Sequence, residues 1–344
     1  MDYKDPPVRS SHTLHMSAHP AGPPKVAIVI ATYDRSNVLA HAIESVRRSS
    51  LTEWELLVVG DACTDDTAEV VAGFHVSRIR FVNLEHNVGE QSGPNNIGAS
   101  LVSAPILALL NHDDLFFPDH LARSLAHLEA TGADLVFSAV AAADPRSAEQ
   151  LAQRNLGFTL LGVSPDGSYQ PYVFAPASGW VMRRALMDEL GGWRPARDCS
   201  IEPSQDFLFR AWRAKKRLLA LPAVTVLAVQ SGKRKDSYLR RQCPEVDYFS
   251  ARMKDDPGFR EAVISSAAFE HARRFIVASR TLNCTPLQIA SVVLYKWICR
   301  LGFHPRALTM RIRHGRGGWI RELRRIRGLD GQINRKGEQH ERTS

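Results

Sequence analysis

Two adjacent aspartates, Asp113 and Asp114, follow an apolar stretch of strand length at residues 106–110. Neighbouring carboxylates at the end of a buried strand repel each other unless a cation or ligand hydroxyl groups satisfy them. Oxygen ligands of this kind suit Mg²⁺ or Mn²⁺, and Mg²⁺ often takes one or two protein carboxylates together with a diphosphate. The pair predicts a metal site, although an isolated Asp-Asp is also common in a solvated turn before a helix.

A third acidic residue, Asp61, follows a second apolar stretch at residues 54–59. A carboxylate at such a strand tip can accept a hydrogen bond from a nucleobase N–H or a ribose hydroxyl, and we expect this role for Asp61. Asp65 and Asp66 come soon after, where their simplest interpretation is favourable charge at a helix N-terminus.

Residues 32–35 (Thr-Tyr-Asp-Arg) follow the first apolar stretch, at residues 26–31, and contain no glycine. A dinucleotide-binding fold needs G-x-G-x-x-G at this point so that backbone amides can approach a pyrophosphate. Its absence argues against a nicotinamide-dependent enzyme, and a P-loop is absent from the sequence as well.

Asp206 stands next to Phe207, Leu208 and Phe209 in a segment of helical character. Desolvation by such neighbours could raise the pKa of its carboxyl group, as a general base requires. The alternative is an ordinary carboxylate in the first turn of a helix.

The elements that must position these residues follow a regular alternation. Apolar stretches of strand length alternate with segments of helical periodicity, and they lie at residues 26–31, 54–59, 79–84, 106–110 and 134–140. This alternation predicts βαβ units and an α/β fold with a mostly parallel sheet flanked by helices. Ligands of such sheets bind at the carboxyl ends of the strands, where the residues above are found.

The composition fits a folded protein, with 44% hydrophobic and 23% charged residues in a chain of 344. We find neither an apolar stretch of about 18 residues that could span a membrane nor a secretory signal, so we expect a cytoplasmic active face. The five cysteines are scattered without C-x-x-C spacing, which favours reduced thiols over a disulfide framework or structural zinc.

We divide the chain into a flexible leader at residues 1–24, a main domain at residues 25–245 and a helical, basic region at residues 246–344. Helices are expected at residues 259–279 and 287–301. The net charge of +8 is concentrated after residue 300, where 11 Lys/Arg stand against 4 Asp/Glu.

Within this basic region, residues 318–327 predict a short helix with Trp319, Leu323 and Ile326 on one face and arginines on the other. Such a helix can lie in an anionic headgroup layer, so an anionic membrane surface is a possible partner. It can equally dock its apolar face on the main domain. Nucleic-acid binding is not expected, because no recognised module accompanies the charge.

Taken together, the strand-end motifs resemble the family 2 glycosyltransferases, whose GT-A fold binds nucleotide sugars. The resemblance covers about residues 26–229. It rests on motifs in order and at comparable spacing, at residues 31–35 (Ala-Thr-Tyr-Asp-Arg), 59–67 (Val-Gly-Asp-Ala-Cys-Thr-Asp-Asp-Thr), 87–89 and 95–98 (Asn-Val-Gly and Asn-Asn-Ile-Gly), 112–114 (His-Asp-Asp), 179–184 with 190–193, and 202–212.

The resemblance implies an inverting, metal-dependent transfer of a sugar from a nucleoside-diphosphate sugar to a glycan or lipid-linked acceptor, in cell-surface polysaccharide or glycolipid assembly. The main domain then divides into a nucleotide-sugar-binding half (residues 25–140) and an acceptor-side half (residues 141–245). Asp206 is the implied catalytic base, and Asp114 the metal ligand with help from Asp113. The implied donor-binding residues are Ala31, Tyr33, Asp61, Asn95 and Asp113.

The sequence also departs from the family pattern. Gly60 replaces the first acid of a usual Asp-Asp pair, Gln205 replaces a usual Glu, and Pro94 stands where many relatives carry Arg. The diphosphate therefore needs another cation, for which Lys233 and Arg234 in a basic loop are candidates, although the loop could equally be solvated surface.

Two other functions stay open. A nucleotidyltransferase on a related sheet would want a glycine-rich basic loop after the first strand, which residues 32–35 do not provide. An inactive glycosyltransferase-like scaffold at a membrane surface is disfavoured by the retained Asp113, Asp114 and Asp206.

Overall fold

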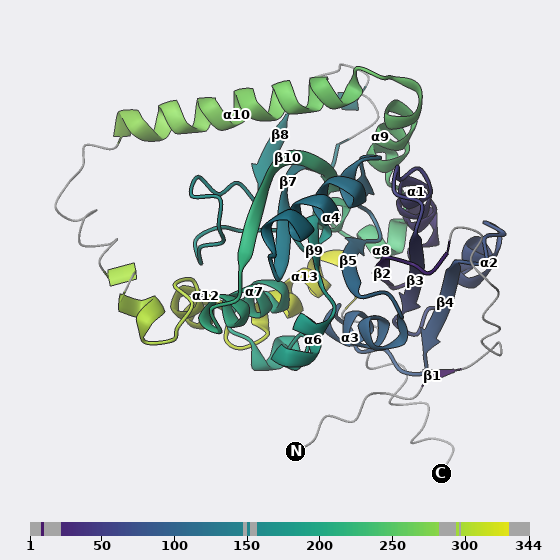
Figure 1. Cartoon of the computed structure of the whole chain (residues 1–344), viewed down its shortest axis with the longest axis horizontal. Coiled ribbons are helices and arrows are strands. Elements are labelled where there is room, and N and C mark those ends of the chain that lie inside the picture. The colour runs from purple at the N-terminus through teal and green to yellow at the C-terminus, as the bar shows by residue number, and fades with distance from the viewer. Residues whose placement is uncertain are drawn as a thin grey trace, which may run out of the picture.

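The computed structural model describes residues 8–9, 22–146, 150–151, 157–281, 294–295 and 297–329. These residues form one mixed sheet of ten strands with helices on its faces (Figure 1). Along the sheet the strand order is β1-β4-β3-β2-β5-β9-β7-β10-β6, and β8 pairs with β7. The strands are β1 (Val8–Arg9), β2 (Val26–Thr32), β3 (Trp54–Gly60), β4 (Ile79–Leu84), β5 (Ile106–Asn111), β6 (Leu115–Phe116), β7 (Leu135–Ala143), β8 (Phe158–Leu161), β9 (Trp180–Arg183) and β10 (Leu218–Val229).

The helices occupy the segments between and after the strands. They are α1 (Ser36–Arg47), α2 (Thr67–Ala72), α3 (Ser92–Leu101), α4 (His120–Thr131), α6 (Ala185–Leu190), α7 (Pro203–Arg213), α8 (Ser237–Arg240), α9 (Pro244–Asp255), α10 (Phe259–Thr281), α12 (Ala307–His314) and α13 (Gly318–Arg327). Short 3₁₀ helices are η1 (Ala177–Gly179), η2 (Ala196–Asp198) and η3 (Ser231–Lys233).

Strands β4, β3, β2 and β5 are parallel neighbours and form the half of the sheet that the sequence predicts most directly. Every residue of β2 and β3 is buried, as expected of strands covered by helices on both faces. All five predicted strands are present, and β7 continues three residues beyond the predicted end at residue 140. The predicted α/β fold is confirmed.

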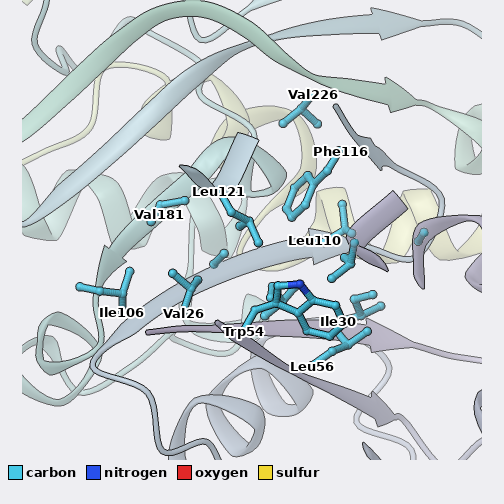
Figure 2. Packing of buried hydrophobic residues seen from close by; sticks show 14 of the residues in the cluster. Val26, Ile30, Trp54, Leu56, Ile106, Leu110, Phe116, Leu121, Val181 and Val226 are labelled. Carbon is cyan, nitrogen blue, oxygen red and sulfur yellow. The ribbon is translucent and has the colours of Figure 1, made fainter. Parts of the chain in front are cut away.

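Side chains of the parallel strands alternate between two cores, one on each face of the sheet. Val26, Ile28 and Ile30 of β2 join one hydrophobic cluster, and Ala27 and Val29 join the other. Figure 2 shows the first cluster, in which the Trp54 indole lies among apolar side chains of β2, β3 and β5. Full burial of each large apolar side chain stabilises the fold by about 1.5–3 kcal/mol, so this layer fixes the strand ends that carry the site.

Strand β9 runs antiparallel between β5 and β7, and β10 is parallel to β7. One sheet therefore joins the two predicted halves, 25–140 and 141–245, whose division stays a prediction. The arrangement brings the carboxyl end of β10 close to the residues that follow β5. The Val229 amide at the end of β10 donates a hydrogen bond to Asp114 Oδ1 at 3.0 Å.

The first turn of helix α1 is held by a carboxylate from a neighbouring loop. Ser36 is its first helical residue, and its backbone N–H donates to Asp65 Oδ2 at 3.1 Å. The other oxygen of Asp65 accepts the Thr67 amide at 3.1 Å at the start of α2. One carboxylate from a neighbouring loop thus satisfies amides of both helices, as the dipole interpretation of Asp65 predicts in part.

After the sheet, α9 packs on α1 and α10 crosses β8 and β7 along one edge of the molecule (Figure 1). Helix α10 agrees with the prediction for residues 259–279, whereas most of the segment predicted at 287–301 lies outside the described residues. Most of the leader and residues 330–344 also lie outside them. None of the described helices is long and apolar enough to cross a lipid bilayer.

Candidate active site

A cavity of about 400 Å³ lies at the carboxyl ends of β2, β3 and β5. Parallel strands present their carboxyl ends at one edge of a sheet, which explains why residues far apart in the sequence meet here. The strand ends contribute Ala31, Thr32, Tyr33, Asp61, Asn111, His112, Asp113 and Asp114. Five of the predicted donor and metal residues, Ala31 included, are among them.

Asp61 lines the cavity but also holds the neighbouring loop. Its two carboxylate oxygens accept the backbone amides of Val88 and Gly89, at 2.6 and 2.8 Å. Burial raises the pKa of Asp61 to about 6, although these two hydrogen bonds act in the opposite direction. A carboxylate has about four acceptor positions, so Asp61 retains capacity for a ligand donor.

Gly60, the departure from the family's acid pair, has a steric cause. A Cβ atom at Gly60 would lie 2.5 Å from Asn83 Oδ1 and 3.1 Å from a Phe81 ring carbon. The Asn83 side chain in turn bonds both the amide and the carbonyl of Cys63. The loop after β3 therefore leaves no room for a second carboxylate beside Asp61.

Asp114 is a buried residue whose oxygens are already engaged. It accepts hydrogen bonds from Asn111 Nδ2 at 2.9 Å, Ser178 Oγ at 2.5 Å and the Val229 amide at 3.0 Å. Burial, and then the charge of Asp113, raise the pKa of Asp114 to about 8. The geometry thus gives Asp114 a position that joins β5, η1 and β10, and not the open carboxylate that was predicted as the main metal ligand.

Asp113 has the more open position of the two. Its Oδ2 accepts a hydrogen bond from Ser231 Oγ, and the residue lines the cavity while being less buried than Asp114. A carboxylate oxygen that faces a cavity is a ligand that Mg²⁺ and Mn²⁺ accept. The donor set at this edge fits a hard divalent cation held through Asp113.

A second acidic group, Asp34 with Cys63 and Asp65, also converges, but its oxygens serve the turn. Asp34 Oδ1 accepts the amides of Thr64 and Asp65 at 2.7 and 3.2 Å. Burial raises the pKa of Cys63 to about 12, which keeps the thiol protonated. This group is a hydrogen-bonded turn between β2 and β3.

An aromatic wall stands on the side of β2. The Tyr33 and Tyr238 rings stack with their centroids 6.3 Å apart, and both residues line the cavity. The segment after β10 that carries η3 and α8, and with it Tyr238, is held by Arg35. This buried side chain donates to the Ser237 carbonyl at 2.9 Å and to Ser231 Oγ at 3.1 Å. Arg35 belongs to the quoted β2 motif, so its role is to fix this segment.

The other predicted donor residues, Asn95, Lys233 and Arg234, differ in whether they line the cavity and in their hydrogen-bond partners. Asn95 is buried in α3 and is not among the residues that line the cavity, whereas Pro94 is. Arg234 bonds the buried Glu245 at 2.7 Å. Lys233 lines the cavity, but its ammonium group pairs with Asp144 at 2.8 Å.

Two carboxylates at the start of α7 also differ in whether they line the cavity. The predicted base, Asp206, accepts Arg210 Nε at 2.8 Å and is not among the cavity-lining residues. Glu202, the residue that precedes α7, lines the cavity. Its Oε1 lies 3.3 Å from an Arg306 nitrogen, while its buried Oε2 has no hydrogen-bond partner among the described residues.

Helix α13 forms part of the cavity wall. The cavity is lined by Trp319, Ile320, Leu323, Arg324 and Arg327, so the expected face needs correction. These positions recur at helical spacing and place two arginines beside Trp319 and Leu323, while Ile326 is not among the lining residues. The apolar face docks on the main domain, which is the alternative to a free membrane-binding face.

Sequence reasoning missed Tyr238, Arg324 and Arg327 as cavity residues. The spacing of residues 320, 324 and 327 could have predicted the position of the two arginines, because these residues lie on one face of a helix. The signal for Tyr238 was absent, since only the folding of the segment after β10 brings it to Tyr33.

Comparison with known proteins agrees with this geometry. Residues 27–191 match the model of the family described as glycosyl transferase family 2. An uncharacterized glycosyltransferase, YwdF of Bacillus subtilis, is 28% identical over 59% of this chain and 73% of its own length. WfgD of Escherichia coli, a UDP-Glc:alpha-D-GlcNAc-diphosphoundecaprenol beta-1,3-glucosyltransferase, is 30% identical over 28% of this chain and 38% of its own.

Among solved structures, S. aureus TarS residues 1–349 in complex with UDP-GlcNAc superpose with a TM-score of 0.51. The match covers 91% of this chain and 92% of that one at 14% identity, which shows a shared GT-A fold. The family match ends at residue 191, before α7, β10 and α13. Residues 27–191 are therefore similar to the glycosyl transferase family 2 domain, and this match together with the relatives supports a glycosyltransferase.

Proposed function

We propose that the cavity binds a nucleoside-diphosphate sugar and that the enzyme transfers the sugar, with inversion, to an acceptor hydroxyl. The observation that carries this proposal is the meeting of Tyr33, Asp61 and Asp113 at one sheet edge, in a cavity of about 400 Å³. This volume is within the range of small-molecule sites, roughly 300–1,000 Å³.

The nucleoside would lie between the aromatic wall and Asp61. Tyr33 and Tyr238 offer aromatic surface for a base, and Asp61 offers acceptor positions for its N–H groups. Asp113 would contact the ribose and hold Mg²⁺ or Mn²⁺, taking the main metal role that the sequence analysis gave to Asp114. When bound, the cation offsets negative charge on the departing diphosphate.

The acceptor side is formed by the start of α7, and we assign the general base to this segment. The acceptor oxygen would attack the anomeric carbon, the bond from that carbon to the diphosphate oxygen would break, and the hydroxyl proton would pass to a carboxylate. Cavity position favours Glu202 over Asp206, because the Asp206 carboxylate is bound to Arg210 and its partner Arg210 also donates to the Leu190 and Gly192 carbonyls. Asp206 then positions the Gly-Gly turn before Trp193.

The name of one relative supports a class of acceptor. WfgD is named for a diphosphoundecaprenol-linked acceptor, so we propose a lipid-linked or glycan acceptor in cell-surface polysaccharide assembly. We also place the reaction at the cytosolic face of a membrane, with peripheral attachment through residues 297–312. Trp297, Leu301, Phe303, Leu308 and Ile312 of this segment are all more than half exposed. Exposed Arg300, Arg311 and Arg313 stand among them and would face anionic headgroups.

The test is transfer from a panel of nucleotide sugars, with Mn²⁺, to a bacterial lipid extract that contains polyprenyl-diphosphate sugars. The expected result is a labelled lipid product whose new linkage has the opposite anomeric configuration to the donor, as read by NMR coupling constants. A product that retains the donor configuration would contradict inversion, and the absence of labelled lipid with every donor would contradict the acceptor class.

A further inference from the structure

Helix α13 lies outside the family 2 match, yet backbone hydrogen bonds fasten both of its ends to the main domain. At its start, the Gly317 amide donates to the Cys199 carbonyl at 3.1 Å. At its end, the Ile326 carbonyl accepts the Asp236 amide at 2.8 Å. These bonds fix the direction in which the helix presents its cavity-lining face.

That face carries two arginines whose charge is not neutralised locally. Arg324 Nη1 donates to the Gly89 carbonyl at 2.6 Å, and Arg327 Nε donates to the Gly232 carbonyl at 3.3 Å. Neither guanidinium forms an ion pair with a carboxylate of the described residues. By contrast, Arg325 on the same helix pairs with Glu322 at 2.6 Å.

Both arginines lie near residues assigned to the nucleoside and near the loop that contacts Asp113. The charge of Arg324 lowers the pKa of Asp61, against the larger effect of burial. The Arg327 guanidinium lies 6.0 Å from the centroid of the Tyr238 ring. Their position is therefore between Asp61, the aromatic wall and the loop that holds Asp113 through Ser231.

Two glycines make this approach possible. A Cβ atom at Gly89 would lie 2.5 Å from Arg324 Nη1, and one at Gly232 would lie 2.7 Å from Arg327 Nη2. Any side chain at either position would displace the guanidinium from the cavity wall. Gly232 has no left-handed backbone angle, so an alanine there is not strained in the backbone itself.

The donor diphosphate requires positive charge in the cavity, and the side chains predicted to supply it are already paired with carboxylates. Arg234 is bonded to Glu245, Lys233 is paired with Asp144, and Pro94 offers no charge. A diphosphate carries at least two negative charges into a cavity whose other charged groups are mostly carboxylates. Guanidinium groups bind phosphate through two parallel N–H···O bonds, which suits them to this anion.

We propose that Arg324 and Arg327 of α13 bind the diphosphate of the nucleotide-sugar donor, so that a helix outside the family domain completes the donor site. This inference rests on the proposed donor cavity. It gives the basic C-terminal region a role in substrate binding, and it explains why two glycines stand opposite the two arginines.

The test is calorimetric titration of the full chain with UDP, GDP, ADP, CDP and dTDP, and with the matching monophosphates, in the presence of Mn²⁺. In the Arg324→Ala and Arg327→Ala variants we expect the affinity for the binding diphosphate to fall about tenfold or more each, the scale of one lost hydrogen bond to a charged group. The monophosphate should lose much less, so the affinity ratio of diphosphate to monophosphate should fall. Arg321→Ala, an exposed position on the same helix, is the control and should match the wild type.

Gly232→Ala gives a second route that keeps both arginines and should lower the same ratio by displacing Arg327. Arg327→Lys should restore only part of the affinity, because an ammonium group lacks the planar fork. An unchanged ratio in the folded arginine variants would overturn the inference and leave the proposed function intact. Failure of every nucleotide to bind the wild type would instead overturn the proposed donor cavity, and the arginine assignment with it.

Discussion

Asp113 and Asp114 are adjacent aspartates with different surroundings in the fold. Asp114 is buried and hydrogen-bonded by three elements, whereas Asp113 is less buried. The sequence indicates a carboxylate pair at a strand end but not which of the two faces the cavity. Hydrogen bonds from three separate elements engage Asp114, and only tertiary structure could show this. The assignment of the metal to Asp114 therefore becomes a prediction about Asp113.

We expect Asp113→Ala to abolish the Mn²⁺-dependent part of nucleoside-diphosphate binding while the melting temperature stays close to that of the wild type. Asp114→Ala should leave buried donors unsatisfied at about 1–3 kcal/mol each, which lowers the melting temperature by several degrees. Titration with and without EDTA, together with thermal unfolding, checks both effects. Loss of metal dependence in Asp114→Ala alone, in a stable protein, would restore the original assignment.

The same reasoning applies to the base at α7. We expect Glu202→Gln to reduce sugar transfer by roughly 10²–10⁴, the usual contribution of a general base, with donor affinity within a few-fold of the wild type. Asp206→Asn should mainly destabilise the fold, because it weakens the anchor of Arg210. Single-turnover transfer at matched fractions of folded protein separates the two. Near-normal transfer by Glu202→Gln with a large loss in Asp206→Asn would return the role to Asp206.

At the scale of elements, the sequence predicts the parallel strands well, because each is a continuous apolar stretch between turn residues. It does not predict β9 as an antiparallel insertion between β5 and β7, since the strand pattern carries no information about its partners. The sequence predicts the position of helix α13 but not the face that lines the cavity. That face contains Ile320 and not Ile326, and it includes Arg324 and Arg327, which the sequence places on the opposite face. Long side chains such as arginine can line a cavity beside apolar residues.

The contact between α4 and β10 provides a pH-dependent prediction. His120 is buried, and its Nδ1 lies 2.8 Å from Thr225 Oγ1. Burial lowers the pKa of His120 to about 3, well below the ordinary value of 6.5. The unfolded chain therefore binds a proton between these values that the folded chain does not, and folding loses stability as the pH falls below about 6.5.

We expect the wild type to lose up to about 1 kcal/mol per pH unit relative to His120→Gln between pH 6.5 and pH 5. Urea unfolding at a series of pH values measures this difference. A constant difference between the two proteins over that range would show that His120 is not held neutral by the fold.

At the scale of the whole molecule, the basic C-terminal region divides into two surfaces. Helix α13 faces the cavity, whereas residues 297–312 present apolar side chains outward. The sequence shows the charge of the region but not this division, because several segments of the region must first pack on the main domain. Membrane attachment is accordingly proposed for residues 297–312 and not for α13.

We expect the double variant Leu308→Glu/Ile312→Glu to reduce sedimentation with phosphatidylglycerol vesicles by roughly tenfold or more, because each residue contributes about 1.5–3 kcal/mol on full burial. Transfer to a soluble acceptor should remain unchanged. Phe269→Glu on α10, which also removes an exposed apolar side chain, serves as the control. An equal loss of binding in both variants would show that no specific surface is involved.

The central claim is that the cavity at the carboxyl ends of β2, β3 and β5 binds and cleaves a nucleotide-sugar donor. The most direct measurement is nucleotide release from a panel of nucleotide sugars by the wild type and by Asp113→Ala, with Mn²⁺ and with EDTA. Our account predicts that the wild type releases a free nucleoside diphosphate from at least one donor with Mn²⁺, and that EDTA or Asp113→Ala abolishes the release. A reaction that forms or consumes pyrophosphate would indicate a nucleotidyltransferase. No nucleotide release from any donor would indicate an inactive scaffold. Either result would contradict the claim.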